Sequence, residues 1–166
     1  MIALPQQRRG GGMKYLYWAL PMATVIAYGV WRYFAAQVYV GGLPPFDLHL
    51  YSFEQAQTYL AGLTPAAKAI YLGPLHLADA LLMFCLAITL VLPIWRWDWP
   101  WFLPAMAYVG FDLLENDKVA RLLRGGLCIT ADVENVTLMT SLKFVALAVA
   151  AALALWSLWR MRRVAR

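Results

Sequence analysis

The sequence predicts an all-α integral membrane protein: one domain over residues 1–166, folded as a four-helix bundle with short helices in its first outer loop. Composition supports this class, because 63% of the residues are hydrophobic and only 14% are charged. Soluble domains are about 45–50% apolar and about 25% charged. Intrinsic disorder is excluded as well, because disordered chains have low hydrophobicity. The third observation is that four apolar segments approach or exceed the roughly 20 residues that a helix needs to cross a bilayer.

The four spans are expected over about residues 15–38, 72–92, 101–120 and 136–159. The first apolar run is too long for a signal peptide, and no small-residue cleavage site follows it, so we interpret it as a membrane helix. The third span has the shortest apolar run, because it contains Pro104 and ends in acidic residues.

Lysine and arginine are distributed unequally between the two sides of this topology. Cytoplasmic segments of membrane proteins carry an excess of these residues, so both termini are expected in the cytoplasm. Basic chain ends also favour contact with anionic membrane lipid rather than with nucleic acid, which we do not expect as a partner. The residues on the expected cytoplasmic side are Arg8, Arg9, Lys14, Arg96, Arg160, Arg162, Arg163 and Arg166, and those on the outer side are Lys68, Lys118, Arg121 and Arg124.

Tryptophan supports the same orientation. Indole rings prefer the headgroup region of a bilayer and form belts at the ends of spans. Only Trp31 lies away from a predicted cytoplasmic helix end. The segment 95–101 is therefore expected to be a tight cytoplasmic turn. The residues of the expected belt are Trp18, Trp95, Trp97, Trp99, Trp101, Trp156 and Trp159.

The outer segment 40–71 carries signals for two short helices. Glycine and proline in the run 41–45 end the first span. Ser52 and Gln55 have the spacing of a capping box, and Thr64-Pro65 is typical of a second helix start. Two interpretations of this segment remain open: a helix lying on the membrane surface, or a lid over an outward-facing pocket. The apolar residues that would rest on the membrane or on the bundle are Phe53, Tyr59, Leu60 and Leu63.

Polar residues inside the spans gather at one level, in the outer half of the bundle. Ionisable groups within a membrane are costly and often mark a ligand or ion route. Their spacing of three or four residues places them on single helix faces. We therefore expect an outer-half polar pocket that binds a small amphipathic or isoprenoid-like molecule, with acid/base chemistry left open. The candidate ligand-binding residues are Arg32, His76, Asp79, Asp112, Glu115, Asn116 and Lys143.

Other interpretations of these residues remain open. Lys143 paired with Glu115 or Asp112 would also serve as a folding lock, in a structural or accessory subunit of a membrane complex or in a homo-oligomer. A proton-coupled transporter is a third alternative, although no inverted repeat is apparent. For acid/base chemistry, Asp112 or Glu115 would pair with Asp79 or Asp132.

No metal or cofactor is expected. The only histidines are His49 and His76, and H-E-x-x-H is absent. The two cysteines, Cys85 and Cys128, lie far apart in the sequence without a C-x-x-C pattern, so redox or metal chemistry at cysteine is not expected either.

The sequence from about residue 51 onward resembles a family of small bacterial four-span membrane proteins. The resemblance lies in F-D-x-x-E-N at 111–116 and T-x-x-K at 140–143, with further similarity over 51–71 and 75–79. It implies a bacterial inner-membrane location and the four-span fold, but it brings no activity.

The layout is also similar to that of the EXPERA class, which includes sterol isomerases and the sigma-2 receptor. That class has four spans, cytoplasmic termini, a helical first loop and acidic residues around a lipid-like ligand. Asp79, Asp112 and Glu115 occupy comparable places here. The similarity is one of architecture and does not extend to the isomerase reaction.

Overall fold

The computed structural model describes residues 11–95, 97–125 and 130–164. Every element in this part of the chain is helical, so the predicted all-α class is confirmed. Several residues used above to predict topology and chemistry lie outside the described residues: Arg8, Arg9, Arg96, Cys128 and Arg166, together with the side chain of Lys14. The elements are α1 (Gly11–Ala35), η1 (Ala36–Val38), η2 (Phe46–Leu48), α2 (Phe53–Gly62), α3 (Pro65–Ile70), η3 (Tyr71–Leu75), α4 (His76–Val91), η4 (Leu92–Ile94), η5 (Trp99–Phe102), α5 (Leu103–Gly125) and α6 (Thr130–Val164).

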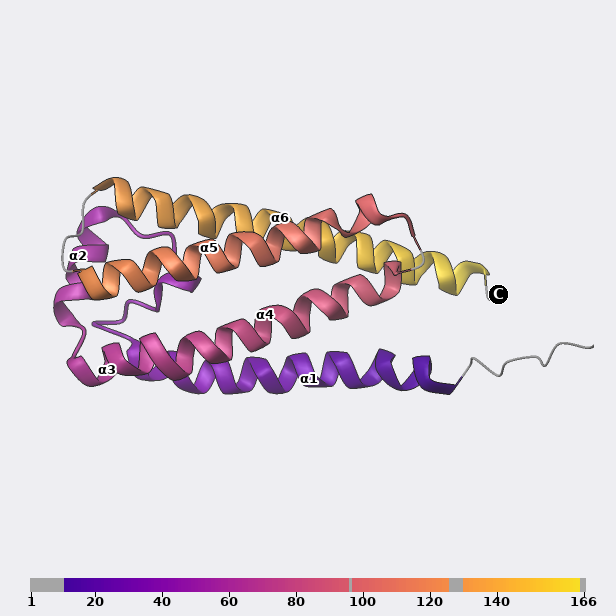
Figure 1. Cartoon of the computed structure of the whole chain (residues 1–166), viewed down its shortest axis with the longest axis horizontal. Coiled ribbons are helices and arrows are strands. Elements are labelled where there is room, and N and C mark those ends of the chain that lie inside the picture. Colours follow the sequence, from indigo (N-terminus) through magenta and orange to yellow (C-terminus); the bar gives the residue numbers. More distant parts are fainter. Residues whose placement is uncertain (1–10, 96, 126–129, 165–166) are drawn as a thin grey trace, which may run out of the picture.

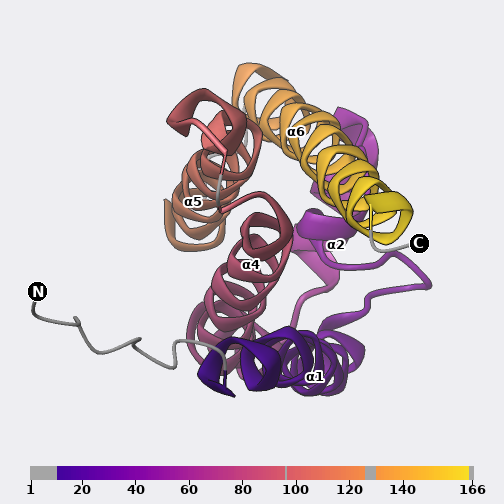
Figure 2. The ribbon, with the colours of Figure 1, turned by 90° about the vertical axis from the view of Figure 1, so that its right-hand side faces the viewer.

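The long helices α1, α4, α5 and α6 run lengthwise beside one another, and the short elements around α2 and α3 gather at one end (Figure 1). The start of α1 and the end of α6 both lie at the other end. Seen along the bundle, α1 packs against α4 and α5 packs against α6, with α4 also contacting α5 (Figure 2). The bundle therefore consists of two helix pairs that meet along α4 and α5.

Two continuous helical stretches, Pro65–Ile94 and Thr130–Arg163, are long and apolar enough to cross a membrane. They contain the second and fourth expected spans and extend beyond the predicted boundaries. The first and third expected spans fall on α1 and α5. Helix α5 is less apolar because it carries the acidic motif at 111–116 together with a charged C-terminal end.

The second short helix expected in the outer segment is present as α3, which begins at Pro65 as predicted from Thr64-Pro65. Thr64 does cap a helix, with its hydroxyl oxygen 3.1 Å from the Ala67 amide nitrogen. That helix continues through the wider π-helical turn η3 directly into α4. The turn contains Pro74, which lacks an amide hydrogen, and a π-turn accommodates such an interruption without ending the helix.

The outer segment packs on the bundle. The capping box of Ser52 and Gln55 is present, with both reciprocal hydrogen bonds. Behind it, Tyr59 is fully buried and belongs to the same core cluster as Trp31 of α1 and Val133 of α6. The other residues for which the membrane surface was an alternative, Phe53, Leu60 and Leu63, pack against this cluster.

The opposite end of the bundle is rich in aromatic side chains. The ring of Trp97 contacts those of Trp101 and Trp156 edge to face, at 5.3 and 5.2 Å between centroids. Ser157 of α6 donates a hydrogen bond of 2.7 Å to the carbonyl of Pro93. These contacts fasten α6 to the connection between α4 and α5.

Candidate functional site

The centre of the candidate site is a buried group of three charges on α5 and α6. Lys143 Nζ lies 3.1 Å from Asp112 Oδ1 and forms a second ion pair with Glu115 Oε2. The three side chains are 6%, 3% and 0% exposed. Asp112 and Glu115 are three residues apart on α5, so both carboxylates reach the same face and the same ammonium group. The sequence predicted that Lys143 pairs with Glu115 or with Asp112, and in the structure it pairs with both.

Residues on one face of α6 connect this charged group to the outer segment. Thr140 lies one turn before Lys143, is fully buried and donates a hydrogen bond to Glu115. One turn earlier, Thr137 donates to the carbonyl of Tyr51 at 3.2 Å. The T-x-x-K spacing therefore has a physical explanation: it aims a hydroxyl and an ammonium group at one carboxylate.

Asn116 joins α4 to α5. Its side-chain amide donates to Asp79 Oδ2 at 2.6 Å and to Asp112 Oδ2 at 3.3 Å. Asp79, on α4, is 7% exposed. The F-D-x-x-E-N pattern thus supplies two carboxylates for Lys143 and one amide that bridges two aspartates. We call Asp79, Asp112, Glu115, Asn116 and Lys143 the acidic–lysine cluster.

Two of the predicted site residues lie outside this cluster. His76 is half-buried one turn before Asp79, and its ring lies edge-on to that of Tyr71 at 5.6 Å. Arg32 is exposed on α1 and has no ion pair or hydrogen bond to the cluster among the described residues, so its predicted convergence with the cluster is wrong. The buried face of α1 contains Ala27, Trp31 and Ala35. Arg32 follows Trp31 directly, and because each residue of a helix is rotated by about 100° from the one before it, the Arg32 side chain points away from this face.

A further carboxylate, Asp47, joins the site from the outer segment and was not predicted. It lies in η2 and is only 3% exposed. Its Oδ1 accepts a hydrogen bond of 3.3 Å from the Tyr71 hydroxyl, which in turn accepts one of 3.0 Å from the Phe46 amide. Burial raises the pKa of Asp47 well above its usual value, with nearby Asp79 adding to the effect and Lys143 opposing it. In the sequence, the only signal was a carboxylate between two apolar residues after a proline pair.

A cavity of about 400 Å³ opens beside the cluster, between the two helix pairs. Its polar wall consists of Asp47, Asp79, Asp112 and Lys143, together with the phenol of Tyr108. The cavity begins at this polar wall and continues away from the outer segment. It runs beside residues 24–31 of α1, which make about two helical turns. The apolar wall includes Trp31, Leu82, Leu86 and Leu147, and the exposed rim includes Val25, Tyr28 and Phe144. We call this cavity the lateral pocket, because its rim lies on the outer faces of α1 and α6.

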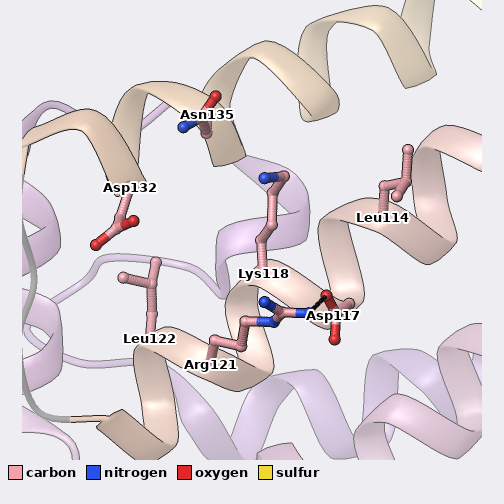
Figure 3. A pocket seen from close by; sticks show the side chains of 7 residues that line it. All are labelled: Leu114, Asp117, Lys118, Arg121, Leu122, Asp132 and Asn135. Carbon is pink, nitrogen blue, oxygen red and sulfur yellow. Dashed lines mark ion pairs between the residues drawn. The ribbon is translucent and has the colours of Figure 1, made fainter.

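A second pocket of about 410 Å³ lies between the C-terminal half of α5 and the first turns of α6 (Figure 3). It contains the ion pair of Arg121 and Asp117, at 2.7 Å, in which both side chains are more than half exposed. Exposed ion pairs of this kind contribute little to stability. Asp132 lines this surface pocket, so the predicted pairing of Asp132 with Asp112 or Glu115 is wrong. The remaining lining residues are Leu114, Lys118, Leu122 and Asn135.

Among the described residues, no group of three or more His, Cys, Asp or Glu side chains is arranged to hold a metal ion. No protein-family model, curated protein or solved structure matches this chain. The site is therefore interpreted from its own geometry, which joins an acidic–lysine cluster to an apolar pocket.

Proposed function

We propose that this protein is a four-span protein of a bacterial inner membrane and that its lateral pocket binds one small amphipathic, isoprenoid-like molecule. The polar head of the molecule would lie against the acidic–lysine cluster and its apolar chain would extend between Leu82, Leu86 and Leu147. The observation that carries the proposal is the placement of a buried polar wall at one end of an otherwise apolar cavity. A volume of about 400 Å³ is within the range of small-molecule pockets, about 300–1,000 Å³.

The four-span topology is supported by the outward faces of all four long helices. A soluble protein rarely exposes many large apolar side chains, whereas a surface in contact with lipid consists of such side chains. All four long helices expose large apolar side chains. An apolar surface of this kind therefore surrounds the whole bundle, as expected if all four helices contact lipid. Examples are Val25 and Ile26 on α1, Leu81 and Ile88 on α4, Met106 and Leu113 on α5, and Val145 and Leu155 on α6.

The proposed orientation places both termini in the cytoplasm. The start of α1 and the end of α6 lie at the same end of the bundle. That end also carries the contacts among Trp97, Trp101 and Trp156, and the guanidinium of Arg163 lies 3.7 Å over the ring of Trp159. Tryptophan and arginine together are typical of a cytoplasmic interface.

Within the cluster, the residues divide between holding the fold and facing a ligand. Glu115 is fully buried, does not line the lateral pocket and accepts a hydrogen bond from Thr140, so it fixes the position of Lys143. Asp79, Asp112 and Lys143 line the lateral pocket. This division favours a binding site over a cluster that serves folding alone.

A structural subunit of a membrane complex is the second candidate. The observation in its favour is that Lys143 already has two carboxylate partners within the protein. Under this alternative the lateral pocket would hold bulk lipid, and the cluster would lock α5 to α6.

Mass spectrometry of small molecules extracted with the protein in native nanodiscs tests the proposal. The wild type would be compared with Asp112→Asn, with Leu86→Trp, which fills the apolar end of the pocket without touching a charge, and with Asp117→Asn as a matched control on the exposed face of α5. We expect a defined molecule that is enriched in the wild type and the control and lost from the other two variants. Bulk lipid alone in all four samples would contradict ligand binding and favour the structural subunit.

A further inference from the structure

The mouth of the lateral pocket differs in polarity from its interior. Every charged side chain that lines the pocket is at most 7% exposed. The large apolar and aromatic lining residues at the surface are 40–69% exposed, and we call them the mouth: Val25, Tyr28, Leu48 and Phe144. Apolar side chains around an opening are unfavourable in water and favourable in hydrocarbon. The mouth is therefore suited to lipid, although the interior of the pocket is charged.

The mouth lies on the side of the bundle where α1 faces α6. Val25 and Tyr28 belong to α1, and Phe144 belongs to α6. In the described part of the chain, α1 packs along α4, α4 along α5 and α5 along α6, whereas α1 and α6 make no extensive contact with each other (Figure 2). The lateral pocket therefore opens at the one junction of neighbouring long helices that side chains do not close.

The outer segment closes the pocket toward the outer solution. Its element η2 lines the pocket, and Phe46 in η2 is fully buried. The segment is attached on both sides of the mouth. Tyr59 donates a hydrogen bond of 2.7 Å to the carbonyl of Val38, directly after α1, and the carbonyl of Tyr51 accepts one of 3.2 Å from Thr137 of α6. A ligand arriving from the outer solution would have to displace this packed segment.

The opposite end of the pocket is closed as well. Leu86 and Leu147 line this end and pack against a buried cluster formed by α4, α5 and α6. On α1, the hydroxyl of Thr24 lies 2.9 Å from that of Thr89, which joins α1 to α4 at this level. Among the described residues, the mouth between α1 and α6 is thus the opening through which the pocket communicates with its surroundings.

We propose that the bound molecule is a lipid dissolved in the bilayer, that it enters the pocket sideways between α1 and α6, and that the part of its chain that exceeds the pocket remains in the bilayer. This inference rests on the proposed binding function and four-span topology, and it names the class of ligand: a long-chain membrane lipid. The pocket runs beside two helical turns, or about 11 Å. A closed pocket of this length would reject longer chains, whereas an open mouth leaves the excess chain in hydrocarbon.

Isoprenoids of increasing length test the open mouth. The probes are the geranyl, farnesyl, geranylgeranyl and solanesyl chains, each carried by an alcohol and by an amine. Neutral and cationic heads are chosen because three carboxylates and one lysine line the pocket. Binding to the wild-type protein in lipid nanodiscs would be measured by native mass spectrometry. We expect each solanesyl compound to bind at least as tightly as the farnesyl compound with the same head. A loss of binding once the chain exceeds the pocket would overturn the open mouth.

A bulky label at the mouth tests the route. Val25→Cys and Ile26→Cys would each be made in a background in which Cys85 and Cys128 are serine, and modified with pyrene maleimide in detergent before reconstitution. Both positions are exposed on α1 at nearly the same depth, but Val25 lines the pocket and Ile26 does not. Compared with the same protein before labelling, we expect the label at 25 to abolish solanesyl binding and the label at 26 to leave it unchanged. Equal binding by the two labelled proteins would overturn the route between α1 and α6.

The pocket-filling variant Leu86→Trp separates this inference from the proposed function. If none of the probes binds, or if Leu86→Trp does not weaken binding of the farnesyl compounds, the proposed function itself fails. If Leu86→Trp weakens their binding but the solanesyl compounds are rejected, or the label at 25 has no effect, the pocket remains a binding site and only the lateral entry is lost.

Discussion

Lys143 on α6 and Asp112 on α5 form a buried ion pair of 3.1 Å at the place where the bundle interior becomes the wall of the lateral pocket. The same ammonium group also pairs with Glu115, which lies outside the pocket wall. Lys143 therefore couples the packing of α5 on α6 to the shape and charge of the pocket. A change at this lysine should affect both stability and binding, whereas a change at an apolar pocket residue should affect binding more strongly.

We expect Lys143→Met to lower the free energy of unfolding by about 3–5 kcal/mol, because it leaves two buried carboxylates without their cation. Unfolding of the purified protein in detergent micelles would measure the loss. The double variant Lys143→Met with Glu115→Gln should recover part of it, since one stranded charge is then removed. The control is Lys118→Met in the surface pocket between α5 and α6. A loss no larger than that of the control would refute the structural role of the ion pairs.

Tyr71→Phe is expected to destabilise the protein by about 1–3 kcal/mol, because the buried hydroxyl serves both the Phe46 amide and the Asp47 carboxylate. Without that hydroxyl, two further buried polar atoms lose their partner. The matched control is Tyr33→Phe, which removes a hydroxyl from a side chain on the exposed surface of α1. Equal thermal midpoints for the two variants would show that the bridge does not hold η2 in place.

The raised pKa of Asp47 gives a pH dependence with a definite sign. In the unfolded chain Asp47 loses its proton near its ordinary pKa of 3.8, whereas in the folded protein burial and Asp79 keep the proton bound to higher pH. Between these two pKa values the folded state binds more protons, so stability falls as pH rises. The contribution of Asp47 is fully present below about pH 4 and is lost as pH passes the folded pKa.

Asp47→Asn cannot titrate, so within the range from pH 4 to pH 8 the thermal midpoint of the variant relative to the wild type should rise with pH and level off above the raised pKa of Asp47. Thermal unfolding of both proteins in the same detergent across this range would measure the difference. A difference that stays constant with pH would contradict the assignment, because all other titrating groups are shared by the two proteins.

The sequence was sufficient to predict which polar side chains of α5 and α6 meet. Spacings of three and four residues on a helix determine which side chains share a face, and the cost of exposing charges to apolar surroundings favours polar faces that meet inside the bundle. Asp112, Glu115 and Lys143 followed from these two rules. The same rules also explain why Thr140 points toward Glu115.

The parts of the site that could not be predicted lie where these rules give no information. Helix α1 has few polar residues, so its sequence does not reveal that Trp31 faces inward and Arg32 outward. Asp47 lies in a connecting segment, where hydrophobic periodicity does not apply. Its position depends on the packing of Phe46 and on a hydrogen bond to Tyr71, a residue 24 positions away. Side chains brought in by tertiary packing of a loop require the folded structure.

Single-cysteine labelling distinguishes a four-span from a two-span topology. Four positions would be replaced by cysteine one at a time, in a background in which Cys85 and Cys128 are changed to serine. Glu54 lies in α2, Trp99 in η5, Arg124 at the end of α5 and Arg162 near the end of α6. A membrane-impermeant maleimide would be applied to intact cells and to permeabilised cells.

The two topologies pair these positions differently. If α1, α4, α5 and α6 all cross the membrane with cytoplasmic termini, cysteines at 54 and 124 should react in intact cells, and those at 99 and 162 only after permeabilisation. If only the stretches Pro65–Ile94 and Thr130–Arg163 cross, position 54 falls on the same side as 162, and position 99 on the same side as 124. Joint labelling of positions 54 and 162 would therefore refute the four-span topology. Joint labelling of 54 and 124 would mean that α5 crosses the membrane despite its acidic residues, as expected if Lys143 and Asn116 hold those residues inside the bundle.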